Sequence, residues 1–175
     1  DTNPGTNSSA PWQTVAAGFG QFSSLPAGGS IQFCQGGAFQ VGTEGGTRLV
    51  NSAATAAVPV SLTDYQPTWA SGDEGRPVLH QEEPAYGVIT LQDGGYPEHH
   101  EGVLVENLEL RATTGTGFAI FMANDQDHVL IDNVLVDGFD IGVYSGGSND
   151  CATSDPGCDR DNENITLRSS TITNN

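Results

Sequence analysis

Apolar and polar residues alternate over short stretches of this chain instead of recurring at helical spacing. Three nine-residue segments, 103–111, 129–137 and 165–173, share one such pattern and align without gaps. In each segment the first and third residues are apolar, as in a strand that buries every second side chain. The alternation predicts β-strands, and its recurrence predicts a repeated structural unit.

A polar position interrupts each segment at the same place. Asn107 and Asn133 hold this position in the first two segments, and Ser169 holds it in the third. The alternation resumes one residue out of phase, which predicts a tight bend between two short strands. Asparagine tolerates the left-handed backbone conformation that such a bend requires. Short strands bent at fixed points predict the successive turns of a solenoid rather than an antiparallel sandwich.

The motif Val-x-Ile-Asp-Asn-x-x-Val at 129–136 is followed by Gly-Phe-x-Ile-Gly-Val at 138–143. This combination resembles the repeat of pectate-lyase-like proteins, and residues 76–80 and 25–31 resemble the first full coil and the opening of secreted bacterial members. The resemblance covers roughly residues 25–175 and is most specific over 103–143. It implies an all-β fold, a right-handed parallel β-helix (solenoid) of about four to five coils with an irregular N-terminal cap.

We expect residues 1–30 to form a polar tail and this cap, and residues 31–175 to form the β-helix. Apolar residues between 12 and 25 predict a capping layer or short helix, which Gly18 and Gly20 would interrupt. No cap sequence follows the third repeat. We therefore expect the β-helix either to be truncated here or to be completed by another copy, stacked head to tail into a filament.

The charge of the chain limits its partners. It has 22 acidic residues, five arginines and no lysine, so the net charge is −17. This balance argues against nucleic acid and anionic membrane surfaces, and no apolar run is long enough for membrane insertion. Self-association or an extracellular glycan is the expected partner. The polar start at Asp1 is typical of a mature terminus after signal-peptide removal, so we expect a secreted, extracellular or cell-surface protein.

An Asp-rich segment at 149–163 gathers the oxygen ligands that calcium prefers. Its candidate calcium ligands are Asp150, Asp155, Asp159, Asp161 and Glu163; solvated acidic surface is the alternative interpretation. Cys151 and Cys158 flank a Pro-Gly turn in the same segment and predict a disulfide-closed loop, as in secreted proteins. Cys34 is then expected to be a buried thiol.

Stacked repeats would place equivalent outward residues in columns. One column would contain Glu106, Asp132 and Arg168, and another Arg111, Asp137 and Thr173. The candidate catalytic residues are Asp137, Asp140, Arg111 and Arg168, with ordinary surface charge as the alternative. The resemblance implies lyases that use lysine or arginine with calcium, or inverting hydrolases that use clustered Asp near aromatic residues such as Tyr144. The absence of lysine disfavours the lyase.

His100 lies in the lead-in to the first repeat and His128 in the corresponding lead-in to the second, with Glu101 and Asp127 beside them. Neighbouring coils would bring these four residues together, so they form a candidate transition-metal site, with polar turns as the alternative.

Two function classes follow from these patterns. The favoured class is a non-catalytic extracellular β-helix protein with a structural or surface-binding role, self-associating head to tail. The alternative is a carbohydrate-active enzyme, a polysaccharide lyase or glycoside hydrolase of the pectate-lyase-like type, present here as part of its chain. β-Helices host both classes, so the fold does not decide between them.

Overall fold

The computed structural model describes residue 5 and residues 11–42, 46–82, 87–92, 98–113, 117–147 and 161–175. Within these residues the chain forms thirteen strands and two short helices. The strands lie in three sheets, and every pair of neighbouring strands is parallel. The described part is therefore an all-β parallel structure, as the alternation predicted.

Sheet A has the order β1-β3-β6-β9-β12, with β1 (Ser30–Cys34), β3 (Val60–Tyr65), β6 (His100–Glu106), β9 (Gln126–Asp132) and β12 (Thr166–Arg168). Sheet B has the order β2-β4-β7-β10-β13, with β2 (Ala38–Val41), β4 (Val78–Gln81), β7 (Glu109–Ala112), β10 (Leu135–Asp137) and β13 (Thr171–Thr173). Sheet C contains β5 (Gly87–Gln92), β8 (Phe118–Ala123) and β11 (Ile141–Gly146).

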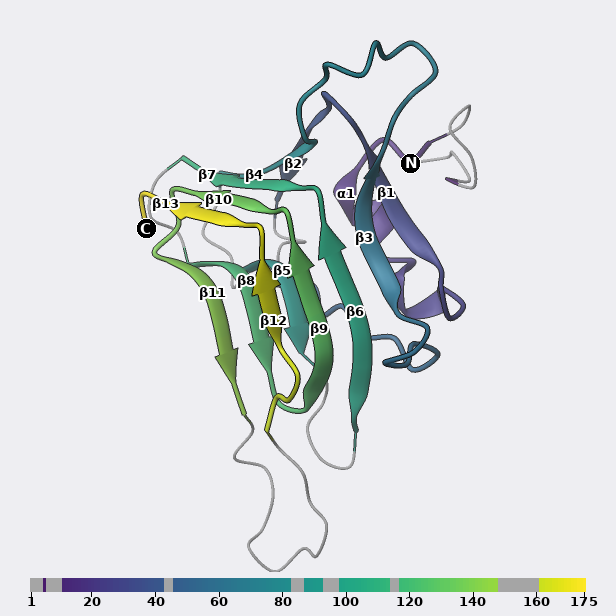
Figure 1. Cartoon of the computed structure of the whole chain (residues 1–175), viewed down its shortest axis with the longest axis vertical. Helices are drawn as coiled ribbons and strands as arrows, with labels where there is room; N and C mark the ends of the chain where they lie inside the picture. Colours follow the sequence, from purple (N-terminus) through teal and green to yellow (C-terminus); the bar gives the residue numbers. More distant parts are fainter. Residues whose placement is uncertain are drawn as a thin grey trace, which may run out of the picture.

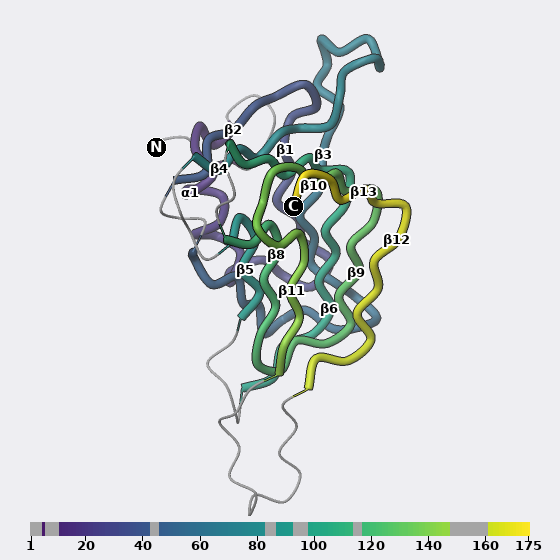
Figure 2. Tube along the Cα trace, turned by 90° about the vertical axis from the view of Figure 1, so that its left-hand side faces the viewer, coloured from purple at the N-terminus to yellow at the C-terminus, as the bar shows by residue number. Residues whose placement is uncertain are grey.

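From β5 onward the chain visits sheet C, then A, then B, and repeats this circuit. Figure 1 shows the strands of each sheet side by side, and Figure 2 shows β12 beside β9 at the edge of sheet A. Equivalent residues of the repeats are register partners: Asp132 lies opposite Glu106 on one side and Arg168 on the other. The predicted stacking of the repeats, and both predicted columns, are confirmed.

The bends between sheets A and B have the predicted backbone conformation. The φ angles of Asn107, Asn133 and Ser169 are 58°, 54° and 51°. The side chains also link the circuits, because Asn133 Nδ2 donates to Asn107 Oδ1 at 2.8 Å and Asn107 Nδ2 donates to Asp64 Oδ1 at 3.0 Å. Asparagine therefore serves both the local bend and the stacking of successive bends.

Gly138 marks the bend from sheet B to sheet C. Its φ is 86°, and a Cβ there would lie 2.5 Å from the carbonyl oxygen of Ala112. Only glycine fits both the conformation and the close approach. The following Phe139 is 1% exposed and belongs to the core. The Gly-Phe pair at 138–139 is thus a turn followed by a core residue.

One hydrophobic core runs between the sheets and continues under the N-terminal segment. The helix α1 (Val15–Phe19) and the 3-10 helix η1 (Phe22–Ser24) bury Val15, Phe19 and Phe22 in this core. Thr14 caps α1 by accepting a hydrogen bond from the Ala17 amide at 3.3 Å. The helix α1 continues through Gly18, where the sequence predicted an interruption, and ends before Gly20, which is its C-cap residue.

The apolar stretch after Pro59 becomes β3, and residues 66–75 form turns and bends without strand. No helix in the described residues is long and apolar enough to cross a membrane.

Candidate functional sites

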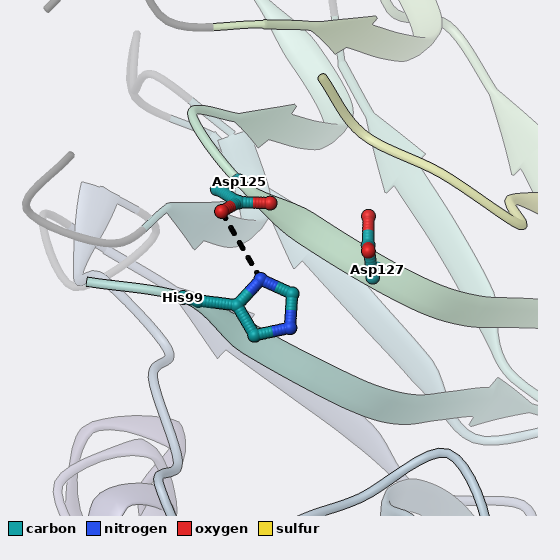
Figure 3. Close-up of side chains that lie close together, drawn as sticks. All are labelled: His99, Asp125 and Asp127. Carbon is teal, nitrogen blue, oxygen red and sulfur yellow. Dashed lines mark ion pairs between the residues drawn. The ribbon is translucent and has the colours of Figure 1, made fainter. Parts of the chain in front are cut away.

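The starts of β6 and β9 bring a histidine and two aspartates together. His99, Asp125 and Asp127 each offer a ligand atom, and these atoms all lie within 4.8 Å of one another. Figure 3 shows the His99 ring and the Asp125 carboxylate pointing toward each other, with Nδ1 and Oδ2 3.1 Å apart. Asp125 and Asp127 are only 5% and 7% exposed, whereas the side chain of His99 is 47% exposed. Such a set is suited to binding a cation.

The electrostatic environment of His99 is strongly negative. Burial disfavours the charged imidazole, but the hydrogen bond with Asp125 and the charges of Asp125, Asp127 and Glu101 outweigh it and raise the pKa of His99. A positive charge at this position is therefore stabilised by its surroundings.

The predicted neighbours His100, Glu101, Asp127 and His128 do lie in adjacent strands. Glu101 is the register partner of Asp127, and His100 is the partner of Gln126. His128 Nδ1 lies 3.2 Å from Glu101 Oε2. The placement of the two segments in neighbouring strands is confirmed, although His100 and His128 are not register partners and the ligand atoms gather around His99, one residue earlier.

The residues that precede β12 make hydrogen bonds with the residues at the start of β9, next to this cluster. The Glu163 amide donates to Asp127 Oδ1 at 2.5 Å, and the Gln126 amide donates to Asn162 Oδ1 at 2.9 Å. The His128 amide in turn donates to the Glu163 carbonyl at 3.0 Å. Asn162 and Glu163 therefore stabilise the start of β9.

Only part of the predicted calcium segment can be placed. Glu163 lies beside Asp127, and Asp161 is exposed two residues earlier. Asp150, Asp155 and Asp159, together with Cys151 and Cys158, lie outside the described residues. The calcium ligands and the disulfide therefore stay predictions.

The first predicted column forms an ion pair across the outer face of sheet A. Arg168 Nη2 donates to Asp132 Oδ2 at 2.7 Å. This hydrogen bond, with the charge of the guanidinium, lowers the pKa of Asp132, and the pKa of Arg168 is raised in return. The negative charge of Glu106 also contributes to the raised pKa of Arg168. The arginine offsets two stacked carboxylates, as ordinary surface charge would.

The second column lies on the outer face of sheet B. Asp137 pairs in register with Arg111 and with Thr173. It accepts hydrogen bonds from Asn174 Nδ2 at 2.6 Å and Thr173 Oγ1 at 3.1 Å, and these bonds lower its pKa. Arg111 donates to Glu109 on the same strand. The carboxylate of Asp137 is thus held in its ionised form.

Asp140 and Tyr144 have different contacts. Asp140 Oδ2 accepts the Gly117 amide at 3.4 Å. Tyr144 is 40% exposed, and its ring stacks on Phe121 with centroids 5.0 Å apart and planes 4° apart. Phe118 completes the cluster at 5.3 Å from Tyr144. Asp137 and Asp140 are therefore fixed by separate sets of partners.

A cavity of about 530 Å³ opens between the N-terminal segment and the first strands. The described residues lining it include five aromatic side chains, Trp12, Phe33, Phe39, Tyr65 and Trp69. None of the described lining residues is acidic or basic. Burial, followed by the influence of Cys34, raises the pKa of Tyr65, so its hydroxyl stays protonated at neutral pH.

Cys34 also lines this cavity. It is a free thiol, half-buried where a buried one was expected, and its Sγ donates to the Gln35 carbonyl at 3.4 Å. Its partial exposure follows from its position at the end of β1, where the side chain faces the cavity instead of the core.

The sequence prediction did not assign His99 and Asp125 as ligands of one site, and it did not find the cavity. The first two could have been found by extending the aligned repeats backward, which places 99 opposite 125. The cavity has no such signal, because its residues come from segments outside the repeats.

Comparison with protein-family models, with curated proteins and with solved structures finds no match for this chain.

Proposed function

We propose that this chain is a non-catalytic extracellular protein of the right-handed parallel β-helix type that binds a neutral glycan in its N-terminal cavity. The recurring circuit through three parallel sheets, with five strands in each of two sheets, supports a β-helix of four to five coils. Connections between parallel strands are nearly always right-handed, which supports the handedness.

The observation that carries the binding role is the composition of the cavity. Aromatic rings line it together with the neutral polar side chains Thr14, Ser30 and Gln32. Sugar rings present apolar C–H faces and hydroxyl edges, so they match a surface of aromatic faces and hydrogen-bonding groups. A chain with a net charge of −17 repels uronic-acid polymers, so a neutral saccharide is the better ligand.

The chemistry of the described acidic residues supports a non-catalytic role. A glycosidase needs one carboxyl group whose pKa is raised, so that it can donate a proton to the leaving oxygen. The pKa of Asp137 is lowered instead. The arginines of the two columns are engaged by Asp132 and Glu109, away from the cavity lining.

Tryptophan fluorescence provides a direct test. The chain has two tryptophans, Trp12 and Trp69, and both line the cavity. Titration with neutral oligosaccharides is expected to shift the emission, and titration with uronic-acid oligomers is not. An unchanged emission across the neutral series, supported by calorimetry without heat, contradicts the proposal.

Trp69 is the residue to change, because it is 68% exposed and its removal leaves the core intact. Trp69→Ala is expected to weaken binding about two- to tenfold, since a stacked aromatic contact contributes roughly 0.5–1.5 kcal/mol. Trp69→Phe should retain much of the affinity. Tyr144→Ala, which removes an exposed aromatic outside the cavity, is the matched control and should bind like the unmodified chain.

The alternative function, a carbohydrate-active enzyme, rests on the neighbouring Arg111 and Asp137 on sheet B. Its test is incubation with uronic-acid polymers and neutral glycans, followed by absorbance of unsaturated products and by reducing-end assays. We expect no product. Product formation that Asp137→Asn abolishes would replace the proposal of a non-catalytic protein.

Self-association and calcium binding are also proposals. Light scattering with and without calcium tests self-association and its dependence on calcium, because calcium that bridges copies would change the size distribution, and calorimetric titration with Ca²⁺ tests binding itself. A monodisperse monomer in both conditions contradicts self-association.

A further inference from the structure

The His99–Asp125–Asp127 cluster lies outside the aromatic cavity and is independent of glycan binding. From its geometry and burial we propose that these three side chains bind a divalent transition-metal ion of the zinc type. The assigned ligands are one imidazole nitrogen of His99 and one carboxylate oxygen each from Asp125 and Asp127.

The spacing of the ligand atoms fits such an ion. Zinc binds histidine nitrogen and carboxylate oxygen at about 2.0–2.2 Å, which places tetrahedral ligands roughly 3.3 Å from one another. The Nδ1–Oδ2 distance between His99 and Asp125 is already 3.1 Å, and every separation in the set is within 4.8 Å. Binding therefore requires the ligand atoms to contract from separations of up to 4.8 Å toward the roughly 3.3 Å of tetrahedral ligands.

The backbone holds the ligands in place. Asp127 is the register partner of Glu101, and His100, which follows the histidine ligand, is the partner of Gln126. Parallel pairing therefore fixes the two strand starts relative to each other. The Glu163 amide orients the Asp127 carboxylate at 2.5 Å, an outer contact of the kind that orients metal ligands.

Burial and charge explain why a cation belongs there. Asp125 and Asp127 are both more than nine-tenths buried, and carboxylates withdrawn from water side by side repel each other. The charges of both aspartates and of Glu101 act on His99. A single imidazolium carries at most one positive charge, whereas a divalent ion compensates both buried carboxylates.

The donor set selects among metals. Calcium takes six to eight oxygen ligands, and the imidazole of His99 is unsuited to that shell. Imidazole together with carboxylate suits zinc and its neighbours among the transition metals. Three protein ligands leave a fourth position for water or an external group.

The experiment uses Zn²⁺ as the probe on the full chain. Competition with a chromogenic chelator, at an ionic strength of about 0.5 M to suppress diffuse binding to the acidic surface, is expected to show one Zn²⁺ per chain. Ca²⁺ at the same concentration should not displace it. Thermal unfolding should shift to higher temperature with Zn²⁺, because an ion that binds only the folded state stabilises it.

Two variants locate the site. His99→Ala removes an exposed ligand, and Asp125→Asn removes a buried charge at constant volume; each is expected to weaken Zn²⁺ binding about 100-fold or more. His80→Ala, which removes a histidine on sheet B, is the matched control and should keep the affinity of the unmodified chain. Circular dichroism confirms that each variant is folded.

Three results would overturn the assignment. One is the absence of Zn²⁺ binding to the unmodified chain at this ionic strength. Another is binding that His99→Ala and Asp125→Asn leave unchanged. The third is equal stabilisation by Ca²⁺ and Zn²⁺, which would indicate an oxygen-only or diffuse acidic site.

Discussion

Asn107 stabilises a bend through its backbone conformation and links neighbouring bends through its side chain. Its backbone has a φ of 58°, its Nδ2 donates to Asp64 at 3.0 Å, and its Oδ1 accepts from Asn133 at 2.8 Å. Gln35 extends the series by donating to Asp64 at 2.5 Å. These bonds connect bends that are far apart in the sequence, so the series stabilises the stacking of the circuits.

We expect Asn107→Ala to lower the free energy of unfolding by about 2–4 kcal/mol. Alanine in the left-handed conformation costs roughly 1–2 kcal/mol, and the lost hydrogen bonds contribute about 1 kcal/mol each. Urea unfolding at neutral pH measures the change. Asn107→Gly is the control, because it keeps the backbone conformation and loses only the hydrogen bonds, so it should destabilise less. Equal losses for both variants would contradict the backbone contribution.

The same residues show what the sequence could and could not reveal. Asn107, Asn133 and Ser169 were predictable because a backbone requirement repeats with the strands. The proposed metal ligands His99 and Asp125 precede the aligned segments, so only an extension of the repeat alignment beyond the apolar pattern would have paired them. Trp12 and Trp69 are 57 positions apart in the sequence, and only the folded chain places both in the lining of one cavity. No sequence pattern connects them, so the cavity could not be predicted.

Neighbouring strands are coupled by side chains as well as by backbone pairing. β9 and β12 share the ion pair between Asp132 and Arg168 on their outer face. The alternation predicted this column because outward residues at equivalent positions must stack. The attraction between Asp132 and Arg168 could be predicted from their opposite charges. The hydrogen bond between Asp137 and Asn174 could not be predicted, because Asn174 follows the aligned segment.

This ion pair predicts a defined dependence of stability on pH. The pKa of Asp132 is lower in the folded protein, so its contribution is present above the ordinary Asp pKa of about 3.9 and is lost as the pH falls through the lowered value. A double-mutant cycle with Asp132→Asn and Arg168→Gln should give a small favourable coupling at pH 7. The coupling should shrink as the pH falls below the ordinary Asp pKa, and a coupling that stays constant across the acid titration would contradict the assignment.

At the scale of the whole molecule, the hydrophobic core stabilises the folded chain, whereas repulsion within its large net charge destabilises it. The core is continuous from the N-terminal helices to β10, whereas the 22 acidic residues give the molecule a net charge of −17. The fold class could be predicted because the core residues alternate with a period of two. The sites could not, because similar acidic residues serve as solvated surface, as ion-pair partners and, in our proposal, as metal ligands.

The charge imbalance predicts that salt stabilises the folded chain. Repulsion among 22 acidic residues outweighs attraction to five arginines, and raising NaCl from about 0.01 M to 1 M shortens the screening length from roughly 30 Å to 3 Å. The melting temperature at pH 7 should therefore rise with NaCl in the absence of divalent ions. Near the pI of about 4.1 the net charge approaches zero, so the same salt series should produce a much smaller rise. Because salt effects on apolar burial are present at both pH values, the difference between the two series isolates screening. A rise of equal size at both pH values, or a fall at pH 7, would show that charge repulsion does not limit the stability of this fold.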